Sequence, residues 1–399
     1  MPPMSYFLSA PQPRVSRTLY LLSASVLVTM TGLGIIWPLV PVYAQEMGAT
    51  GLQLGLIISS FFLARTLFNA PVGRLSDLRG RKPILCVGLL AYAAVSVLYV
   101  LASKLEWLLL VRFLHGLASV LVAPVAMAMA GDIAPLDRVG LYMGTLNMAV
   151  MLGLGIGPIL GGLIRDQFGM DTAFYAMGGL TLLTFFGVRL FLPGEPLKRQ
   201  EREGHSLAPL HGIFKHPIIV GLFLLRLVSA SGQGCVYTFL PLLGLYAGIS
   251  SSQVGMILGA NILLVAFLQR SFGAMADRLN PVHQVVFGTL ISGLAVLVMP
   301  FSGGFAGLLA FNLLMGLGSG IAMPAGLALS ARVGRTLGMG LVMGFTETGA
   351  SLGMIASPIL SGLIMDALDL PSIFLVGGGL ILVGTFPVFL YLRGYEHKP

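Results

Sequence analysis

One short basic loop reads Gly73-Arg74-Leu75-Ser76-Asp77-Leu78-Arg79-Gly80-Arg81-Lys82-Pro83, and it separates two long apolar runs at residues 51–74 and 83–103. An α-helix needs about 20 apolar residues to cross the hydrocarbon layer of a bilayer. Both runs are long enough, so the loop is predicted to join two membrane-spanning helices. Its basic residues favour the cytoplasmic side, where short loops of membrane proteins are enriched in Lys and Arg.

The composition of the whole chain agrees with a membrane protein. Of 399 residues, 56% are hydrophobic and only 10% are charged, whereas about 25% are charged in ordinary soluble domains. The long apolar runs also exclude a disordered chain. A membrane β-barrel would need segments of about 10 residues with alternating polarity, and the sequence contains none. The predicted fold class is therefore an all-α polytopic membrane protein.

Twelve apolar runs are long enough to cross a bilayer as helices. One longer connection, residues 193–216, is rich in charged residues and has the composition of a linker. We therefore predict an N-terminal six-helix bundle (residues 1–192), a cytoplasmic linker (193–216) and a C-terminal six-helix bundle (217–399). The predicted spans are residues 18–44, 51–74, 83–103, 106–131, 139–165, 170–192, 217–246, 251–273, 282–301, 304–331, 338–366 and 371–393.

The distribution of basic residues predicts the orientation of the chain. If the N-terminus is cytoplasmic, 18 of the 23 Lys and Arg residues lie on the cytoplasmic side, and only Lys104 and Arg165 lie outside. This asymmetry predicts that both termini are cytoplasmic, in a cell (inner) membrane. It also accounts for the net charge of +8 without a nucleic-acid partner, because the basic residues lie in short loops beside the lipid bilayer.

The two halves of the sequence repeat at a constant offset of 200 residues. Six predicted helices, an even number, separate the copies, so both halves have the same topology and form a parallel repeat. A site between two such bundles can open to either side of the membrane as the bundles rock. The matches that are least expected by chance are prolines and aspartates: Pro41/Pro241, Asp77/Asp277, Pro124/Pro324, Pro158/Pro358 and Asp166/Asp366.

The basic loop resembles the helix 2–3 signature of the major facilitator superfamily, because the pattern Gly-x-Leu-x-Asp-x-x-Gly-Arg-Lys runs from Gly73 to Lys82. The resemblance extends over nearly the whole chain, since the twelve spans, the linker and the repeat agree with it. It implies a fold of two pseudo-symmetric six-helix bundles. It also implies a cytoplasmic latch that makes and breaks contacts as the bundles rock, here formed by Gly73, Asp77, Gly80, Arg81 and Asp132.

The chemistry of the loop fits a latch. Gly73 would let another helix approach closely, and Gly80 would permit a tight turn. Asp77 lies four residues before Arg81, close enough for a local ion pair if the loop is helical. The alternative is a simple topology signal without a gating role.

The fourth predicted span contains Arg112-Phe113-Leu114-His115-Gly116, which resembles the superfamily motif Arg-x-x-x-Gly. The resemblance implies that Arg112 takes part in proton coupling. An arginine inside a span is costly and normally faces protein or a water-filled cavity; the alternative is that Arg112 reaches to the membrane surface. His115 lies one turn away and could titrate near neutral pH, or it could be a hydrogen-bonded packing residue.

Two further motifs resemble those of the twelve-helix drug:proton antiporters in the superfamily. The fifth span matches the pattern Gly-x-x-x-Gly-Pro-x-x-Gly-Gly, and small residues at this spacing also serve ordinary helix packing. The first span carries Pro38 and Pro41, which would distort the outer half of its helix. The residues of the fifth-span motif are Gly153, Gly157, Pro158, Gly161 and Gly162.

Few charges lie inside the predicted spans. Glu347 is the only carboxylate well inside one, about nine residues or ~13 Å from the cytoplasmic end of its helix. Burial raises the pKa of a carboxylate, so Glu347 is a candidate for proton exchange, unless it forms a permanent ion pair. In the superfamily fold the seventh span lines the cavity, so Arg226 is the better candidate for substrate contact. We expect Arg65 to pair with Glu347 or to bond backbone carbonyls.

These observations predict a secondary active transporter that exports small hydrophobic or amphiphilic compounds in exchange for protons by alternating access. Three intramembrane arginines against one glutamate favour a neutral or anionic cargo. The alternatives are a uniporter or symporter of one metabolite, such as a sugar or organic acid, and a membrane sensor without net flux. The chain lacks phosphate-loop and zinc-protease motifs, so we expect no enzyme activity, cofactor or metal, and we expect a monomer.

Overall fold

The computed structural model describes residues 17–135, 138–193 and 216–394, and the secondary structure in these ranges is helical. The N-terminal group of helices comprises α1 (Arg17–Ile36), α2 (Leu39–Glu46), α3 (Gly51–Arg79), α4 (Arg81–Leu101), α5 (Leu105–Val120), α6 (Ala123–Ile133), α7 (Val139–Phe168) and α8 (Met170–Phe191). The C-terminal group comprises α9 (Pro217–Tyr246), α10 (Ser251–Arg278), α11 (Pro281–Val298), η3 (Met299–Phe301), α12 (Gly304–Leu337), α13 (Met339–Ala367) and α14 (Leu370–Leu392).

The prediction of twelve membrane-spanning helices is confirmed. In the described ranges, twelve helical segments are long and apolar enough to cross a bilayer. Their bounds agree with the predicted runs to within a few residues, and the largest extensions are at the ends of α3 and α12. The predicted linker, residues 193–216, lies almost wholly outside the described residues.

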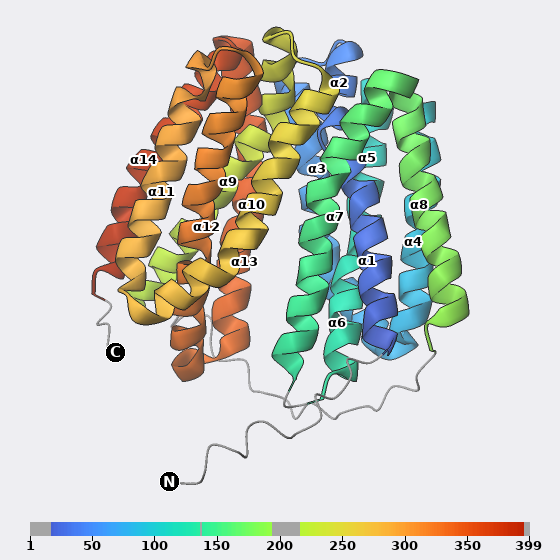
Figure 1. Cartoon of the computed structure of the whole chain (residues 1–399), viewed down its shortest axis with the longest axis horizontal. Helices are drawn as coiled ribbons and strands as arrows, with labels where there is room; N and C mark the ends of the chain where they lie inside the picture. Colours follow the sequence, from blue (N-terminus) through green and yellow to red (C-terminus); the bar gives the residue numbers. More distant parts are fainter. Residues whose placement is uncertain (1–16, 136–137, 194–215, 395–399) are drawn as a thin grey trace.

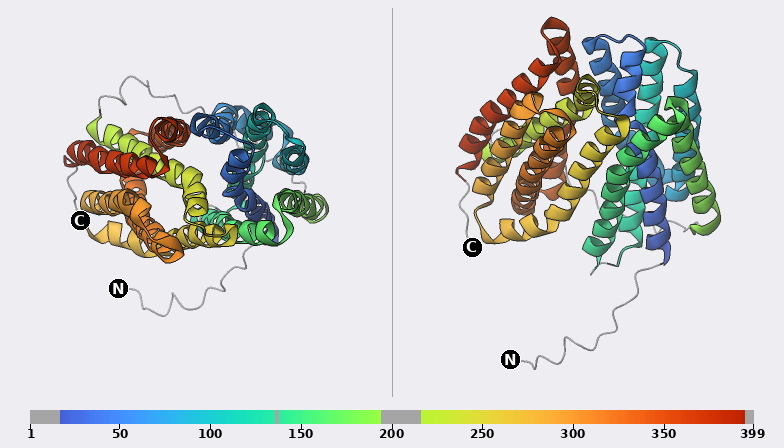
Figure 2. Two further views of the ribbon diagram at one scale, coloured as in Figure 1. Left: turned by 90° about the horizontal axis from the view of Figure 1, so that it is seen from above. Right: turned by 45° about the horizontal axis from the view of Figure 1, so that its top comes forward.

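The two groups of helices lie side by side (Figure 1). Seen from above, they form a ring in which α7 packs against α10 and α3 packs against α13 (Figure 2). We call the end at which α1 begins and α14 ends the terminal end, and the end at which α3 and α10 begin the opposite end. The helices α7 and α10 meet near the opposite end and diverge toward the terminal end (Figure 1).

Two spans of the N-terminal group are broken, and their C-terminal counterparts are continuous. The first span divides into α1 and α2 at Trp37–Pro38, as its two prolines predicted. The fourth span divides into α5 and α6 just before Pro124, since proline removes a helical hydrogen bond and crowds the preceding turn. In contrast, α9 and α12 continue through Pro241 and Pro324.

The repeat is visible in the local structure at the start of α3 and α10. The Thr50 hydroxyl accepts a hydrogen bond from the Gln53 backbone N–H, and the Gln53 side chain accepts one from the Thr50 N–H. Ser250 and Gln253 form the same capping box at the start of α10. Each box satisfies two of the amide groups that a helix N-terminus leaves unpaired.

Candidate functional site

An ion pair joins α9 to α13 inside the spanning region. Arg226 Nη2 lies 2.5 Å from Glu347 Oε1. The Glu347 side chain is 61% exposed and that of Arg226 is 21% exposed, so the pair is not sealed within protein. Glu347 is therefore a carboxylate within a candidate membrane span, Leu341–Ala367, whose side chain the described residues do not enclose, as proton exchange requires.

The partner of Glu347 is thus Arg226 rather than Arg65, where the sequence had favoured Arg65. Arg65 on α3 is still close enough for its charge to interact with that of Glu347. Its guanidinium carbon lies 5.7 Å from the centroid of the Phe61 ring. Since α3 and α13 belong to different groups of helices, Glu347 faces the interface between the groups. Helical periodicity alone could not choose between the two arginines, because both lie on helices that border this interface.

Arg112 lies in the interior of the N-terminal group. Its side chain is 1% exposed, which rules out the alternative that it reaches to the membrane surface. The guanidinium carbon lies over the Phe61 ring, 4.6 Å from its centroid, where the face of an aromatic ring attracts a cation. Nη1 lies 3.4 Å from the Tyr99 hydroxyl and 3.5 Å from Nδ1 of His115.

His115 is fully buried beside Arg112. Its Nδ1 lies 3.0 Å from the Tyr99 hydroxyl, and its ring contacts the rings of Tyr92 and Phe61 edge-on. Because an arginine can only donate, Nδ1 acts as an acceptor toward Arg112, and the neutral ring then carries its proton on Nε2. This geometry matches a hydrogen-bonded packing histidine, and a role of His115 in proton coupling stays a prediction.

Three of the predicted latch residues, Asp77, Arg81 and Asp132, form one cluster. Arg81 forms an ion pair with Asp77 one turn earlier, and its Nε lies 2.8 Å from Asp132 Oδ2 at the end of α6. Its Nη1 also donates to the Ser76 hydroxyl over 2.5 Å. One cation therefore ties α3, α4 and α6 together at the terminal end, and all three helices belong to the N-terminal group.

The two glycines of the loop differ in what they do. Gly80 has a φ of 96°, which side chains other than glycine rarely adopt, so it permits the predicted tight turn between α3 and α4. The expected close helix approach at Gly73 is wrong for this arrangement of the helices, because a Cβ there would meet nothing within 4 Å. The close contacts of α3 with α13 lie nearer its start, at Gly51, Gly55 and Ser59.

The glycine motif of the fifth span lies on α7 and has two faces. One face packs within the N-terminal group: a Cβ at Gly153 or Gly161 would lie 2.6 or 2.1 Å from a backbone oxygen of α1, and one at Gly157 would meet Gly34. The other face meets α10 across the interface. A Cβ at Gly162 would lie 2.2 Å from the Ser251 oxygen, and the oxygen of Pro158 lies against Gly255. The motif therefore serves both helix packing and the contact between the groups.

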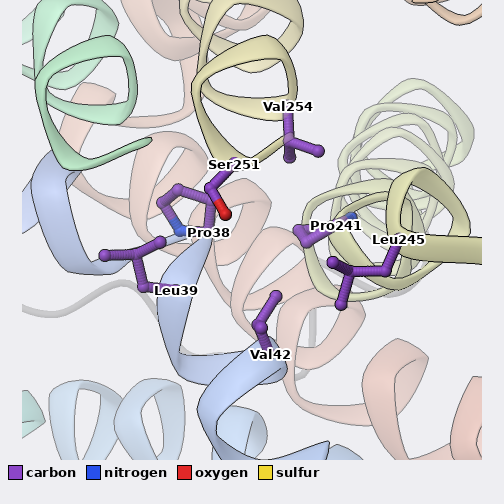
Figure 3. Close-up of a pocket in the computed structure, with 7 residues that line it drawn as sticks. All are labelled: Pro38, Leu39, Val42, Pro241, Leu245, Ser251 and Val254. Carbon is purple, nitrogen blue, oxygen red and sulfur yellow. The ribbon is translucent and has the colours of Figure 1, made fainter. Parts of the chain in front are cut away.

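The sequence did not single out the aromatic residues that join the groups near the opposite end. The ring centroid of Trp37 lies 5.8 Å from that of Tyr237 on α9 and 6.2 Å from that of Phe62 on α3. Beside them lies a small hollow with about 10 Å³ of free volume, enough for one water. Figure 3 shows the seven residues around this hollow, and both groups contribute to them: Pro38, Leu39, Val42, Pro241, Leu245, Ser251 and Val254.

Twelve spanning helices in two repeated groups, with an accessible ion pair where the groups face each other, define a polytopic membrane transporter. Residues 22–243 and residues 222–399 each match the Major Facilitator Superfamily. The chain belongs to this superfamily, and it is a transporter rather than an enzyme.

Three relatives cover nearly the whole chain. An uncharacterized MFS-type transporter of Methanocaldococcus jannaschii is 30% identical over 367 residues, which are 90% of this chain and 94% of that protein. Multidrug resistance protein MdtG of Serratia proteamaculans is 26% identical over 391 residues, 94% of each chain. A multi-drug resistance efflux pump PmrA homolog of Lactococcus lactis is 27% identical over 377 residues, 91% of this chain and 92% of that one.

Solved structures share the fold at low identity. A mutant of the nucleoside transporter NupG has a TM-score of 0.81 and 14% identity, and the match covers 94% of this chain and 100% of that one. A bacterial homolog of the human lysosomal transporter Spinster, in an inward-facing and unoccupied conformation, has a TM-score of 0.78 and 15% identity, with 96% and 98% covered. These likenesses show the fold and leave the cargo open.

Proposed function

We propose that this transporter exports small hydrophobic or amphiphilic compounds in exchange for protons by alternating access. The observation that carries the proposal is Glu347, a carboxylate in the spanning region that is ion-paired to Arg226 and yet 61% exposed. An accessible acid of this kind can take up and release a proton. The relatives named as multidrug resistance proteins, at 26% and 27% identity, support export of diverse compounds.

Protonation of Glu347 has a defined local consequence. The neutral acid no longer attracts the Arg226 guanidinium, so α9 and α13 lose an ion pair and the site gains one positive charge. Arg65 from α3 feels the same change, because its charge interacts with that of Glu347 across the interface. A proton on one oxygen therefore alters the electrostatic attraction between the two groups of helices.

The ion pair also constrains the charge of an exchanged cargo. An anion bound to Arg226 would displace Glu347 and favour its protonation, so anion and proton would bind together and travel in the same direction. A neutral compound that donates a hydrogen bond to Glu347 would instead compete with the proton, as exchange requires. The nearby cations Arg65 and Arg226 disfavour a cationic cargo. If cargo is exchanged for protons at Glu347, the expected cargo is therefore a neutral amphiphile.

The remaining parts of the proposal concern topology. The positive-inside rule assigns the terminal end to the cytoplasm, and the bacterial relatives support the inner membrane. We take residues 1–192 and 217–399 as two bundles that rock relative to each other, joined by residues 193–216. The transporter would act as a monomer, since one chain supplies both bundles.

The test uses purified protein in liposomes that contain a trapped fluorescent pH dye. Neutral, anionic and cationic derivatives of one aromatic compound are added outside, one at a time. Exchange predicts that a transported neutral compound makes the lumen more alkaline as protons leave. Acidification would indicate symport, uptake without a pH change would indicate uniport, and binding without uptake would indicate a sensor. Empty liposomes and the Glu347→Gln variant control for passive permeation.

A further inference from the structure

Two aspartates bind helix N-termini across the interface at the opposite end. Asp166, near the end of α7, accepts hydrogen bonds from the backbone N–H groups of Ser251 (3.2 Å) and Ser252 (2.8 Å). Asp366, near the end of α13, accepts hydrogen bonds from the backbone N–H groups of Gly51 (2.6 Å) and Leu52 (2.8 Å). Each carboxylate thus belongs to one group of helices and binds the first residues of a helix in the other.

These contacts complete the capping of α3 and α10. The first amides of a helix have no intrahelical partner, and the positive end of the helix dipole attracts an anion. The capping residues Thr50 and Ser250 satisfy only the amide of the third helical residue. The amides of the first and second residues are left for Asp366 and Asp166. If the groups separate at this end, two amides on each helix lose a charged acceptor.

Both contacts depend on backbones that touch. A Cβ at Gly51 would lie 2.3 Å from the Gly362 oxygen, and one at Gly55 would lie 2.3 Å from the Pro358 oxygen. In the second copy, a Cβ at Gly255 would lie 2.1 Å from the Pro158 oxygen. The carboxylates reach the helix ends because glycine permits this spacing, so they bind only while the opposite end is closed.

The contact made by Asp166 is reinforced by a neighbouring ion pair, and the contact made by Asp366 is not. Arg165 forms an ion pair with Glu46 on α2 over 2.5 Å and donates to the Ser251 hydroxyl. The matching positions hold Met365 and Tyr246, which carry no charge. The contact made by Asp166 is therefore expected to be the stronger of the two.

We propose that Asp166 and Asp366 form a two-part clamp that holds the opposite end closed and sets the balance between the two orientations of the transporter. The clamp requires no cargo and no proton on Glu347, so it stands apart from the proposed exchange. Losing a helix-capping side chain costs enough to shift an equilibrium about five-fold. Since the two aspartates contact different helices, their effects are expected to multiply to about 25-fold.

The experiment measures distances between spin labels on the full chain in nanodiscs. One pair reports on the opposite end (Lys104→Cys with Phe301→Cys) and one on the terminal end (Leu190→Cys with Leu390→Cys), in a background without Cys86 and Cys235. The variants are Asp166→Ala, Asp366→Ala and the double variant, since asparagine would keep a capping oxygen. The matched control is Asp369→Ala, because Asp369 caps α14 within its own group at the same end.

The clamp predicts that the population with a long distance at the opposite end grows about five-fold in each single variant and about 25-fold in the double variant. Asp369→Ala should leave the distances unchanged. Gly255→Ala should shift them in the same direction without altering any charge, and it serves as the test if the aspartate variants fail to fold. The proposal is overturned if the double variant, or Gly255→Ala in its place, leaves both distance distributions as in the parent.

Discussion

The N-terminal and C-terminal groups share one architecture, yet their buried polar residues differ. Where the N-terminal group places the cation of Arg112 against Phe61, the matching residues of the C-terminal group are Asn312 and Asn261. The Asn261 amide donates to the Asn312 backbone oxygen over 2.5 Å. A buried charge in one group thus corresponds to a neutral hydrogen bond in the other.

The reverse holds at the interface. Glu347 and Arg226 belong to the C-terminal group, and the matching residues in the N-terminal group are Asn147 and Val26. The features that the groups share are backbone devices, namely capping boxes, glycine contacts and the aspartates at the helix ends. The two groups therefore share backbone contacts, whereas their buried charges differ.

The largest effect is expected for Glu347→Gln, because this change removes the only carboxylate found well inside a predicted span. It should abolish pH changes driven by cargo while binding of a neutral cargo is retained and no longer depends on pH. Fluorescence from the trapped dye measures the first, and tryptophan quenching measures the second. The double change Glu347→Asn with Asn147→Glu should not restore exchange, since residue 147 has no matching arginine at residue 26. Full activity of Glu347→Gln would place the coupling elsewhere.

A large effect is also expected for Asp77→Asn, which leaves Asp132 as the one carboxylate of the cluster that pairs with Arg81. Transport should fall several-fold while the amount of protein in the membrane stays constant, if the cluster acts as a latch. Arg79→Gln is the control, because it changes the charge of the same loop without touching the cluster. The C-terminal group has Pro281 in place of Arg81, so Asp277→Asn should be milder. Uptake assays paired with membrane immunoblots decide this, and equal activity of Asp77→Asn and wild type would contradict the latch.

Substitution of the buried polar residues Arg112 and Asn261 should change the stability of the fold in opposite directions. Arg112 has no ion pair among the described residues, so replacing it with Met removes a desolvated charge and should stabilise the fold by up to about 4 kcal/mol. Asn261→Ala removes a buried hydrogen bond and should destabilise the fold by about 1 kcal/mol. Thermal unfolding in detergent measures both. A marked loss of stability in Arg112→Met would show that the cation is structural.

The smallest effect concerns the start of α14, where Asp369 caps a helix whose counterpart α8 follows Gly169 without a side-chain cap. Hydrogen bonds from the Ser372 hydroxyl and backbone N–H hold the pKa of Asp369 below its usual value. Because the folded pKa is lowered, this stabilisation is full at neutral pH and is lost as the pH falls through the folded pKa. Asp369→Gly should lower the melting temperature slightly at pH 7 and less so below about pH 4. If the difference in melting temperature between the parent and Asp369→Gly were as large in acid as at pH 7, the ionised carboxylate of Asp369 would not be the stabilising group.

Much of the fold follows from the sequence, because long apolar runs determine spans and the paired prolines determine where the first helix breaks. The repeat was also visible, and it included Asp166 and Asp366. Their role was not, because it depends on which helix of the other group lies within hydrogen-bond distance. The choice of Arg226 as the partner of Glu347 was missed for the same reason. Periodicity gives the depth of a residue in a helix, whereas ion pairs depend on how helices are rotated and placed.

The two aspartate contacts have a further meaning when they are considered together. Asp166 binds residues 251 and 252, and Asp366 binds residues 51 and 52, so the contact that one copy makes is returned by the other. Reciprocity of this kind is the mark of an isologous interface, in which one surface patch is complementary to itself. A single six-helix unit that carried this aspartate and this helix start would present both halves of this contact to an identical copy.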